Sequence, residues 1–257
     1  MNLGEMLTAL RGELADNVGT IISGQTPTDT LWTDTQLTNY LNWALNRFIA
    51  RTGMIRDAVS AVSQITLSTT APQPVSNAQL YAIDPSITRI MSIRPNGAPD
   101  ALWDLNYVEI DPSANPDLAG VELFQPFEVN YPRAFAPDFT SGQILVYPAY
   151  TGYWPWTQPN GQPYAPILNM RVMRLPLRQL NPLILTATPE IPVQYHMDIV
   201  TGAAFRALNV ADVDASAPGN AATFERLFKE AIQDARRDVR KKTRTTPKFV
   251  VGETGAW

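Results

Sequence analysis

The sequence predicts an α+β protein: an antiparallel helical bundle from both flanks of the chain, an inserted small β-sandwich or barrel, and an extended C-terminal tail. Of 22 prolines, 19 lie between Pro72 and Pro192, and proline breaks helix interiors. Apolar residues recur at helical spacing in the flanks and at every second position in the middle. We therefore expect a helical domain of residues 1–58 and 192–243, a β domain of residues 59–191 and a tail of residues 244–257.

Two helices are predicted in the first flank. The first has one apolar stripe, formed by Leu3, Leu7, Leu10 and Leu14. The second begins after Thr33, which with Gln36 three residues later makes a capping-box pattern. Gly53 is a natural C-terminal stop. The two helices are expected to pack through these apolar faces.

The last flank also predicts two helices. Helical spacing runs from Val193 to about Val210, with Pro192 suited to the first turn. After a connection over residues 214–219, a final helix has an apolar face from Phe224 to Val239 and charged residues on the other side. These helices complete the expected bundle.

Short strands are predicted between the flanks. Leu168, Met170 and Val172 alternate with polar residues, as do the apolar residues of 103–107. A third candidate strand, 87–93, places Arg89 on its apolar side as an exception. A fourth, 144–147, is a short apolar run. Short strands separated by turn residues are typical of a small sandwich or barrel.

Charge is unevenly distributed along the chain. The net charge is −4, yet residues 229–248 contain eight basic and three acidic residues, including all four lysines. Such a segment favours a polyanion or an acidic partner surface, although a solvated helix end explains it equally well. The candidate partner-binding residues in it are Arg236, Arg237, Arg240, Lys241 and Lys242.

An aromatic stretch and the tail are the other candidate binding segments. Five of the ten residues 147–156 are aromatic, and Tyr150, Tyr153, Trp154 and Trp156 could form a protein interface, pack in the core or stack on sugar rings. No basic residue lies between Arg133 and Arg171, which disfavours nucleic acid there. The tail carries the apolar residues Phe249, Val250, Val251 and Trp257, which could dock on another subunit or fold back on their own domain.

Several classes of function are excluded or disfavoured. The chain has no cysteine and one histidine, His196, so thiol chemistry and a multi-histidine metal site within one chain are excluded. No phosphate-binding loop or nucleophile elbow occurs, and no cofactor is expected. His196 is expected to be structural or to lie at an interface. A carboxylate-dependent hydrolase ranks last, because any acidic protein supplies carboxylate pairs.

The composition suggests a protein covered by partners. Charged residues make up 17% of the chain, against about 25% in typical soluble domains. No secretion signal is expected at the N-terminus. The uncharged run 139–170 is long enough to span a bilayer, but its five prolines argue against a membrane helix.

Two segments resemble a known family. Residues 31–44, LWTDTQLTNYLNWA, and residues 80–90, LYAIDPSITRI, resemble the bacteriophage head-to-tail adaptor (connector) family, and so does the layout of flanking helices and trailing tail. The large aromatic insert differs from the smallest members, which are nearly all helix.

The resemblance implies a non-enzymatic structural virion protein, assembled in the host cytoplasm into a ring of twelve copies at the head–tail interface. Its helical part would meet the portal, and its tail would reach the portal or a neighbouring copy. A tail or nozzle protein would bind the far side, and DNA would pass through the centre without sequence-specific binding. The alternative is a carbohydrate-binding module that uses the aromatic stretch.

Overall fold

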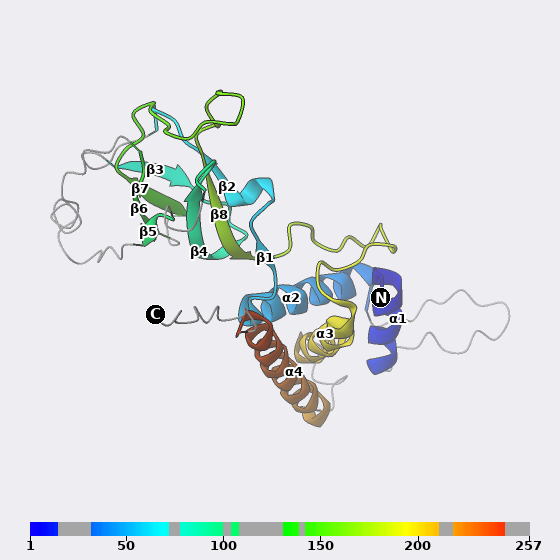
Figure 1. Cartoon of the computed structure of the whole chain (residues 1–257). Helices are drawn as coiled ribbons and strands as arrows, with labels where there is room; N and C mark the ends of the chain where they lie inside the picture. Colours follow the sequence, from blue (N-terminus) through cyan, green and yellow to red (C-terminus); the bar gives the residue numbers. More distant parts are fainter. Residues whose placement is uncertain are drawn as a thin grey trace, which may run out of the picture. The chain divides into compact units, whose positions relative to one another are not determined.

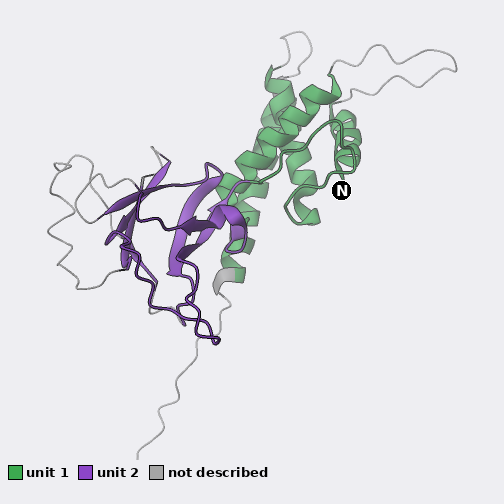
Figure 2. Cartoon of the chain, turned by 90° about the horizontal axis from the view of Figure 1, so that it is seen from above, with its two compact units in different colours: residues 1–55, 176–257 green, residues 56–175 purple. Residues whose placement is uncertain are grey.

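The computed structural model describes residues 1–14, 32–71, 78–99, 104–107, 131–138, 142–210 and 218–244 (Figure 1). Its helices and two sheets confirm a mixed α+β protein. The chain divides into two compact units, unit 1 of residues 1–55 and 176–257 and unit 2 of residues 56–175 (Figure 2). This division lies at 55/56 and 175/176, whereas the sequence suggested 58/59 and 191/192.

Unit 1 is helical. Its elements are α1 (Leu3–Glu13), α2 (Asp34–Thr52), the 3-10 turn η3 (Val193–Tyr195), α3 (His196–Val210) and α4 (Pro218–Arg244). Both predicted signals of α2 are confirmed, because Thr33 and Gln36 form a capping box and Gly53 ends the helix at φ 61°. A second capping box, formed by Asn2 and Glu5, starts α1 and was not predicted.

The last two helices begin at other residues than expected. Pro192 does not lie in a helical turn: it precedes the single 3-10 turn η3 as its N-cap, with ψ 141°, and α3 follows only at His196. α4 begins at Pro218, inside the segment expected to be a connection; proline suits a first helical turn because it needs no N–H partner there. α3 packs on α1, α2 and α4, and the unit's core includes Leu41, Phe48 and Phe228.

Residues 176–191 belong to unit 1, and hydrogen bonds to their backbone groups hold them on the helices. The Asn42 side chain donates to the carbonyl of Leu180 over 2.9 Å and accepts from its N–H over 2.8 Å. The first N–H groups of α1, at Leu3 and Gly4, donate to the carbonyls of Ala187 and Leu185. These carbonyls satisfy donors that a helix start leaves without partners.

Unit 2 contains strands and, among its described residues, no α-helix. The first sheet pairs the long strand β8 (Ile167–Arg174) with β1 (Arg56–Asp57) and β2 (Gln64–Thr66) along one edge and β4 (Ile87–Pro95) along the other. The second sheet has the order β3 (Gln79–Ala82), β7 (Gln143–Tyr147), β6 (Ala134–Asp138), β5 (Asn106–Tyr107), and its β5–β6 pair is parallel. The turn η1 (Ala61–Ser63) precedes β2.

Buried and exposed side chains alternate along a strand as the sequence predicted where the strand pairing is regular. In β8, Leu168, Met170 and Val172 are at most 1% exposed, as predicted. In β4 the pairing with β8 shifts register between Ile87 and Arg89 and again between Ile90 and Ser92. An inserted residue of this kind changes which face later side chains occupy, which explains why Arg89 broke the predicted pattern. Both sheets contribute side chains to one apolar core, which includes Ile93, Ile144 and Leu168.

Candidate functional site

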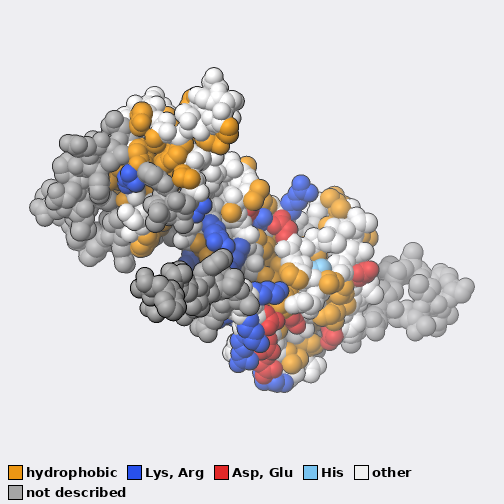
Figure 3. Space-filling model, viewed as in Figure 1, with side chains coloured by type: hydrophobic (Ala, Val, Ile, Leu, Met, Phe, Trp, Pro, Cys, Tyr) orange, Lys and Arg blue, Asp and Glu red, His pale blue; other side chains and the backbone are white. Residues whose placement is uncertain are grey.

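The C-terminal end of α4 carries a cluster of exposed basic side chains. The first half of the helix is neutralised by ion pairs along its own surface: Lys229 with Glu225 at 2.7 Å and Arg226 with Glu230 at 2.9 Å. The last turns carry mostly basic residues, which the negative end of the helix dipole stabilises. The charge along α4 therefore changes from balanced to mostly basic toward its C-terminal end. Figure 3 shows basic and acidic side chains side by side over this helix.

We call Arg236, Arg237, Arg240, Lys241 and Lys242 the α4 basic stripe. All five side chains are exposed. Arg237 pairs with Asp234 at 2.9 Å, whereas Arg236, Arg240 and Lys242 have no carboxylate partner among the residues that the structure describes. Three of the arginines and Gln233 line a shallow hollow of about 190 Å³. The stripe is therefore a cationic surface with uncompensated charge.

The stripe is held at a defined place because α4 packs tightly on α3. Tyr195 donates a hydrogen bond of 3.1 Å to Asp238, the one acid within the stripe's turns. Gly202 of α3 lies directly against the Phe228 ring, so that a Cβ at 202 would come within 2.6 Å of it. Burial, and then the carboxylate of Asp234, raises the pKa of Asp198 on the facing helix.

The predicted aromatic site is mostly core. Tyr150, Trp154 and Trp156 are at most 9% exposed and belong to the apolar core of unit 2. Trp154 and Trp156 pack edge to face with ring centroids 4.9 Å apart, and the Trp154 indole donates to the carbonyl of Asn96 over 3.1 Å. Tyr153 is 55% exposed. Of the four residues, three pack in the core and only Tyr153 offers an exposed ring.

The remaining candidate residues are placed as follows. Phe249, Val250, Val251 and Trp257 lie outside the described residues. His196 is 3% exposed, and its Nε2 lies 3.0 Å from the carbonyl oxygen of Ile191. This contact fixes the start of α3, in agreement with the structural role expected for the histidine.

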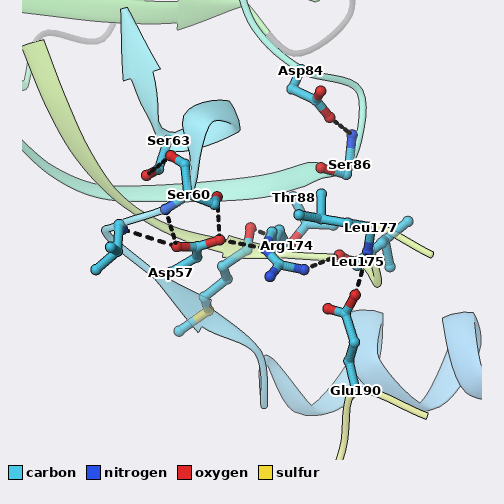
Figure 4. Close-up of polar contacts among 12 residues, drawn as sticks. Asp57, Ser60, Ser63, Asp84, Ser86, Thr88, Arg174, Leu175, Leu177 and Glu190 are labelled. Carbon is cyan, nitrogen blue, oxygen red and sulfur yellow. Dashed lines mark hydrogen bonds and ion pairs between the residues drawn. The ribbon is translucent and has the colours of Figure 1, made fainter. Parts of the chain in front are cut away.

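Unit 2 has a buried ion pair that the sequence did not reveal. Arg174 at the end of β8 donates to Asp57 of β1 over 2.6 Å, and both side chains are about one-tenth exposed, at 11% and 9% (Figure 4). Asp57 also accepts from Ser60 and from the N–H of Val59. Burial would raise the pKa of Asp57, but these hydrogen bonds together outweigh it and hold the pKa well below its usual range. The pair joins two strands 117 residues apart in sequence, so no local pattern could predict it.

Two surface features of unit 1 were also missed. The guanidinium groups of Arg47 and Arg206 both lie over the Trp43 ring, at 5.2 and 5.3 Å from its centroid. Three consecutive aliphatic side chains are exposed by 50% or more: Leu183, Ile184 and Leu185. Both features depend on which segments meet in space. The run of three apolar residues at 183–185 is nevertheless a sequence signal for an apolar surface or core segment.

The described residues offer no metal centre: they contain no group of three or more His, Asp or Glu side chains that could hold an ion. Among the helices described, none combines the length and hydropathy needed to cross a membrane. The basic end of α4 and the exposed aliphatic side chains of residues 183–185 are two surface features of unit 1 that could bind a partner.

Comparison with known families agrees with the motif-based resemblance. A family model described as SU10 adaptor protein matches residues 1–249. No curated protein matches the chain. The family match spans both helical flanks and the insert, and it confirms the resemblance to head-to-tail adaptors that residues 31–44 and 80–90 indicated.

Proposed function

The chain belongs to the SU10 adaptor protein family, and from this we propose that it is a structural protein of a bacteriophage virion that forms a ring between portal and tail. The ring has twelve copies and surrounds a channel through which DNA passes without sequence-specific binding. The protein is not an enzyme and needs no cofactor. It assembles in the host cytoplasm.

The observation that carries this proposal is the extent of the family match, which covers 249 of 257 residues. The surface of unit 1 supports it. Leu183 is 89% exposed, beside Ile184 and Leu185, and contiguous exposed apolar side chains mark protein–protein contacts. The net charge of −4 also fits a channel that must not hold DNA.

We assign the candidate residues to contacts within this assembly. The helical unit 1 (residues 1–55 and 176–257) meets the portal. The α4 basic stripe and the tail residues Phe249, Val250, Val251 and Trp257 contact the portal or a neighbouring copy. Unit 2 (residues 56–175) faces the tail or nozzle protein, and Tyr153 is the one of the four candidate aromatic residues whose ring is exposed. The carbohydrate-binding alternative loses its support, because a single exposed ring does not make a stacking platform.

The test is the mass of the complex formed with the isolated portal of the same phage. We expect the portal to gain about one copy of this protein per portal subunit. Truncation after Arg244 should abolish this gain while the circular dichroism spectrum keeps its helical signal. A protein that adds no mass to the portal would refute the proposed function.

Unfolding of the truncated chain would give a different answer. It would show that residues 245–257 dock on their own copy. The adaptor function would stand in that case, and only the assignment of the tail to another subunit would be wrong.

A further inference from the structure

We propose that the α4 basic stripe binds the acidic segment 108–130 of a neighbouring copy of this chain. The inference rests on the proposed function and makes it more specific, because it chooses the neighbouring copy over the portal as the partner of the stripe. It starts from the charge that the stripe leaves uncompensated: Arg236, Arg240 and Lys242 have no carboxylate partner among the described residues.

The carboxylates of the described helices and strands are largely engaged already. In unit 1, Asp34 pairs with Arg11, and Glu225, Glu230 and Asp234 pair along α4. In unit 2, Asp57 pairs with Arg174 and Asp104 with Arg94. An acidic counterpart for the stripe must therefore come from elsewhere in the chain or from another molecule.

The sequence contains such a counterpart. Residues 108–130 hold five carboxylates and no basic residue: Glu109, Asp111, Asp117, Glu122 and Glu128. The segment begins after β5 and ends at Tyr131, close before β6, so both of its ends belong to unit 2. Its 23 residues could reach roughly 35 Å from these ends. Its charge and length suit a partner outside its own unit.

Ring symmetry favours a neighbouring copy as the source. A ring is closed by heterologous contacts, in which one patch meets a different patch on the next copy. Two copies that met stripe to stripe would place arginines against arginines, whereas stripe against acidic segment is complementary in charge. Every copy carries one of each, so the contact can repeat around a closed ring.

The competing polyanion is DNA. Phosphates would attract the stripe, and each neutralised phosphate adds to a salt-dependent grip. A grip of that kind works against passage through the channel. The acidic segment of the next copy removes this charge, and for that reason we choose it over DNA.

The experiment uses two full-length variants, one with the charge of the stripe reversed and one with the charge of the acidic segment reversed. The first, Arg236→Glu with Arg240→Glu, changes the stripe, and the second, Asp117→Lys with Glu122→Lys, changes the segment. Each variant alone should need at least about tenfold more protein to assemble on the isolated portal, because its altered patch no longer complements the intact one. A mixture of the two variants should assemble at wild-type concentrations. In the mixture, the intact stripe of the second variant can meet the intact segment of the first variant.

The direction of the contact can be read by zero-length crosslinking of amines to carboxylates. If only the first variant is isotopically labelled, Lys241 or Lys242 of the unlabelled variant should link to carboxylates of 108–130 in the labelled one. A contact within one copy would give links of a single isotope and would overturn the inference. A matched control, Arg226→Glu with Lys229→Glu, makes the same charge change on the half of α4 that Glu225 and Glu230 neutralise, and it should assemble normally.

The outcomes separate this inference from the function. Loss of portal binding by the first variant without rescue in the mixture would make the portal the stripe's partner and overturn the inference alone. Normal assembly with weaker retention of duplex DNA would make the partner DNA and overturn it as well. Wild-type protein that adds no mass to the portal would remove the proposed function itself.

Discussion

The contact between Gly202 and Phe228 gives the sharpest prediction for the stability of unit 1. A Cβ at position 202 would lie 2.6 to 2.8 Å from three ring carbons, where ordinary contacts lie at 3.4–4 Å. The ring would have to retreat by about 0.8 Å, the difference between 2.6 and 3.4 Å. Phe228 is 2% exposed and packs on the fully buried Phe48 at 6.2 Å between centroids, which leaves the ring little room.

The expected magnitude follows from two opposing effects of Gly202→Ala. Alanine is favoured over glycine in a helix by about 1 kcal/mol, whereas overpacking a core costs about 1–3 kcal/mol. The variant should therefore lose up to about 2 kcal/mol of unfolding free energy. In a Phe228→Ala background the clash is absent, and the same substitution should stabilise the protein by about 1 kcal/mol.

The assay is urea unfolding of the wild type, both single variants and the double variant, followed by far-UV circular dichroism. The described α-helices all lie in unit 1, so the helical signal reports on that unit. The double-mutant cycle formed by these four proteins should give a coupling free energy of about 1–3 kcal/mol between positions 202 and 228. Equal effects of Gly202→Ala in the two backgrounds would refute the reasoning. Gly12→Ala is the control, because its Cβ meets nothing within 4 Å and should stabilise by up to about 1 kcal/mol in either background.

Three further predictions concern buried charge and the aromatic stretch. Asp57→Asn should lower the unfolding free energy of unit 2 by about 2–4 kcal/mol at neutral pH. Because the pKa of Asp57 is depressed in the folded protein, the difference from the wild type should shrink as the pH falls below the unfolded pKa and should vanish once the wild-type carboxyl is protonated. Thermal unfolding followed over a range of pH measures this difference. Asp198→Asn should raise the melting temperature at pH 7 and leave it unchanged below the unfolded pKa of about 3.9, because the raised folded pKa of Asp198 makes its ionised form the destabilising one. Trp154→Ala should cost about 3–5 kcal/mol in urea unfolding, whereas Tyr153→Ala should change stability by less than about 0.5 kcal/mol.

Each of these predictions has a control or a contrary outcome. For Asp57, the exposed pair Arg226–Glu230 is the control, and Arg226→Gln should cost no more than about 0.5 kcal/mol. A melting temperature of Asp198→Asn that falls at pH 7 would show that the carboxylate stabilises the start of α3. Equal losses for Trp154→Ala and Tyr153→Ala would contradict the burial that separates the two side chains.

Local signals predicted local structure well. The Thr33–Gln36 capping box, the Gly53 stop and the alternation of β8 each depend on residues within a few positions of one another. The start of α3 was placed too early because Val193 keeps helical spacing, yet the chain forms a 3-10 turn there before the α-helix begins at His196.

Features that depend on distant partners were not predictable. The register shifts of β4 exist only relative to β8, and the packing of Gly202 depends on which helix covers it. The aromatic stretch shows the same limit: proline and aromatic residues together were compatible with a loop or a core, and only the surrounding sheets decide that Trp154 and Trp156 are buried.

In the ring proposed above, the positive charge on α4 constrains how the protein would line a DNA channel. Without a covering partner, each copy would present several cations that have no carboxylate partner among the described residues, and twelve copies would together hold phosphates in a salt-dependent way. The proposed contact with a neighbour's acidic segment would remove that hold and would use the same charge to join subunits. Retention of duplex DNA by assembled wild-type rings should therefore be weak. Changing Asp117 to asparagine and Glu122 to glutamine should increase it, because these substitutions remove the acidic cover of the stripe without adding a cation.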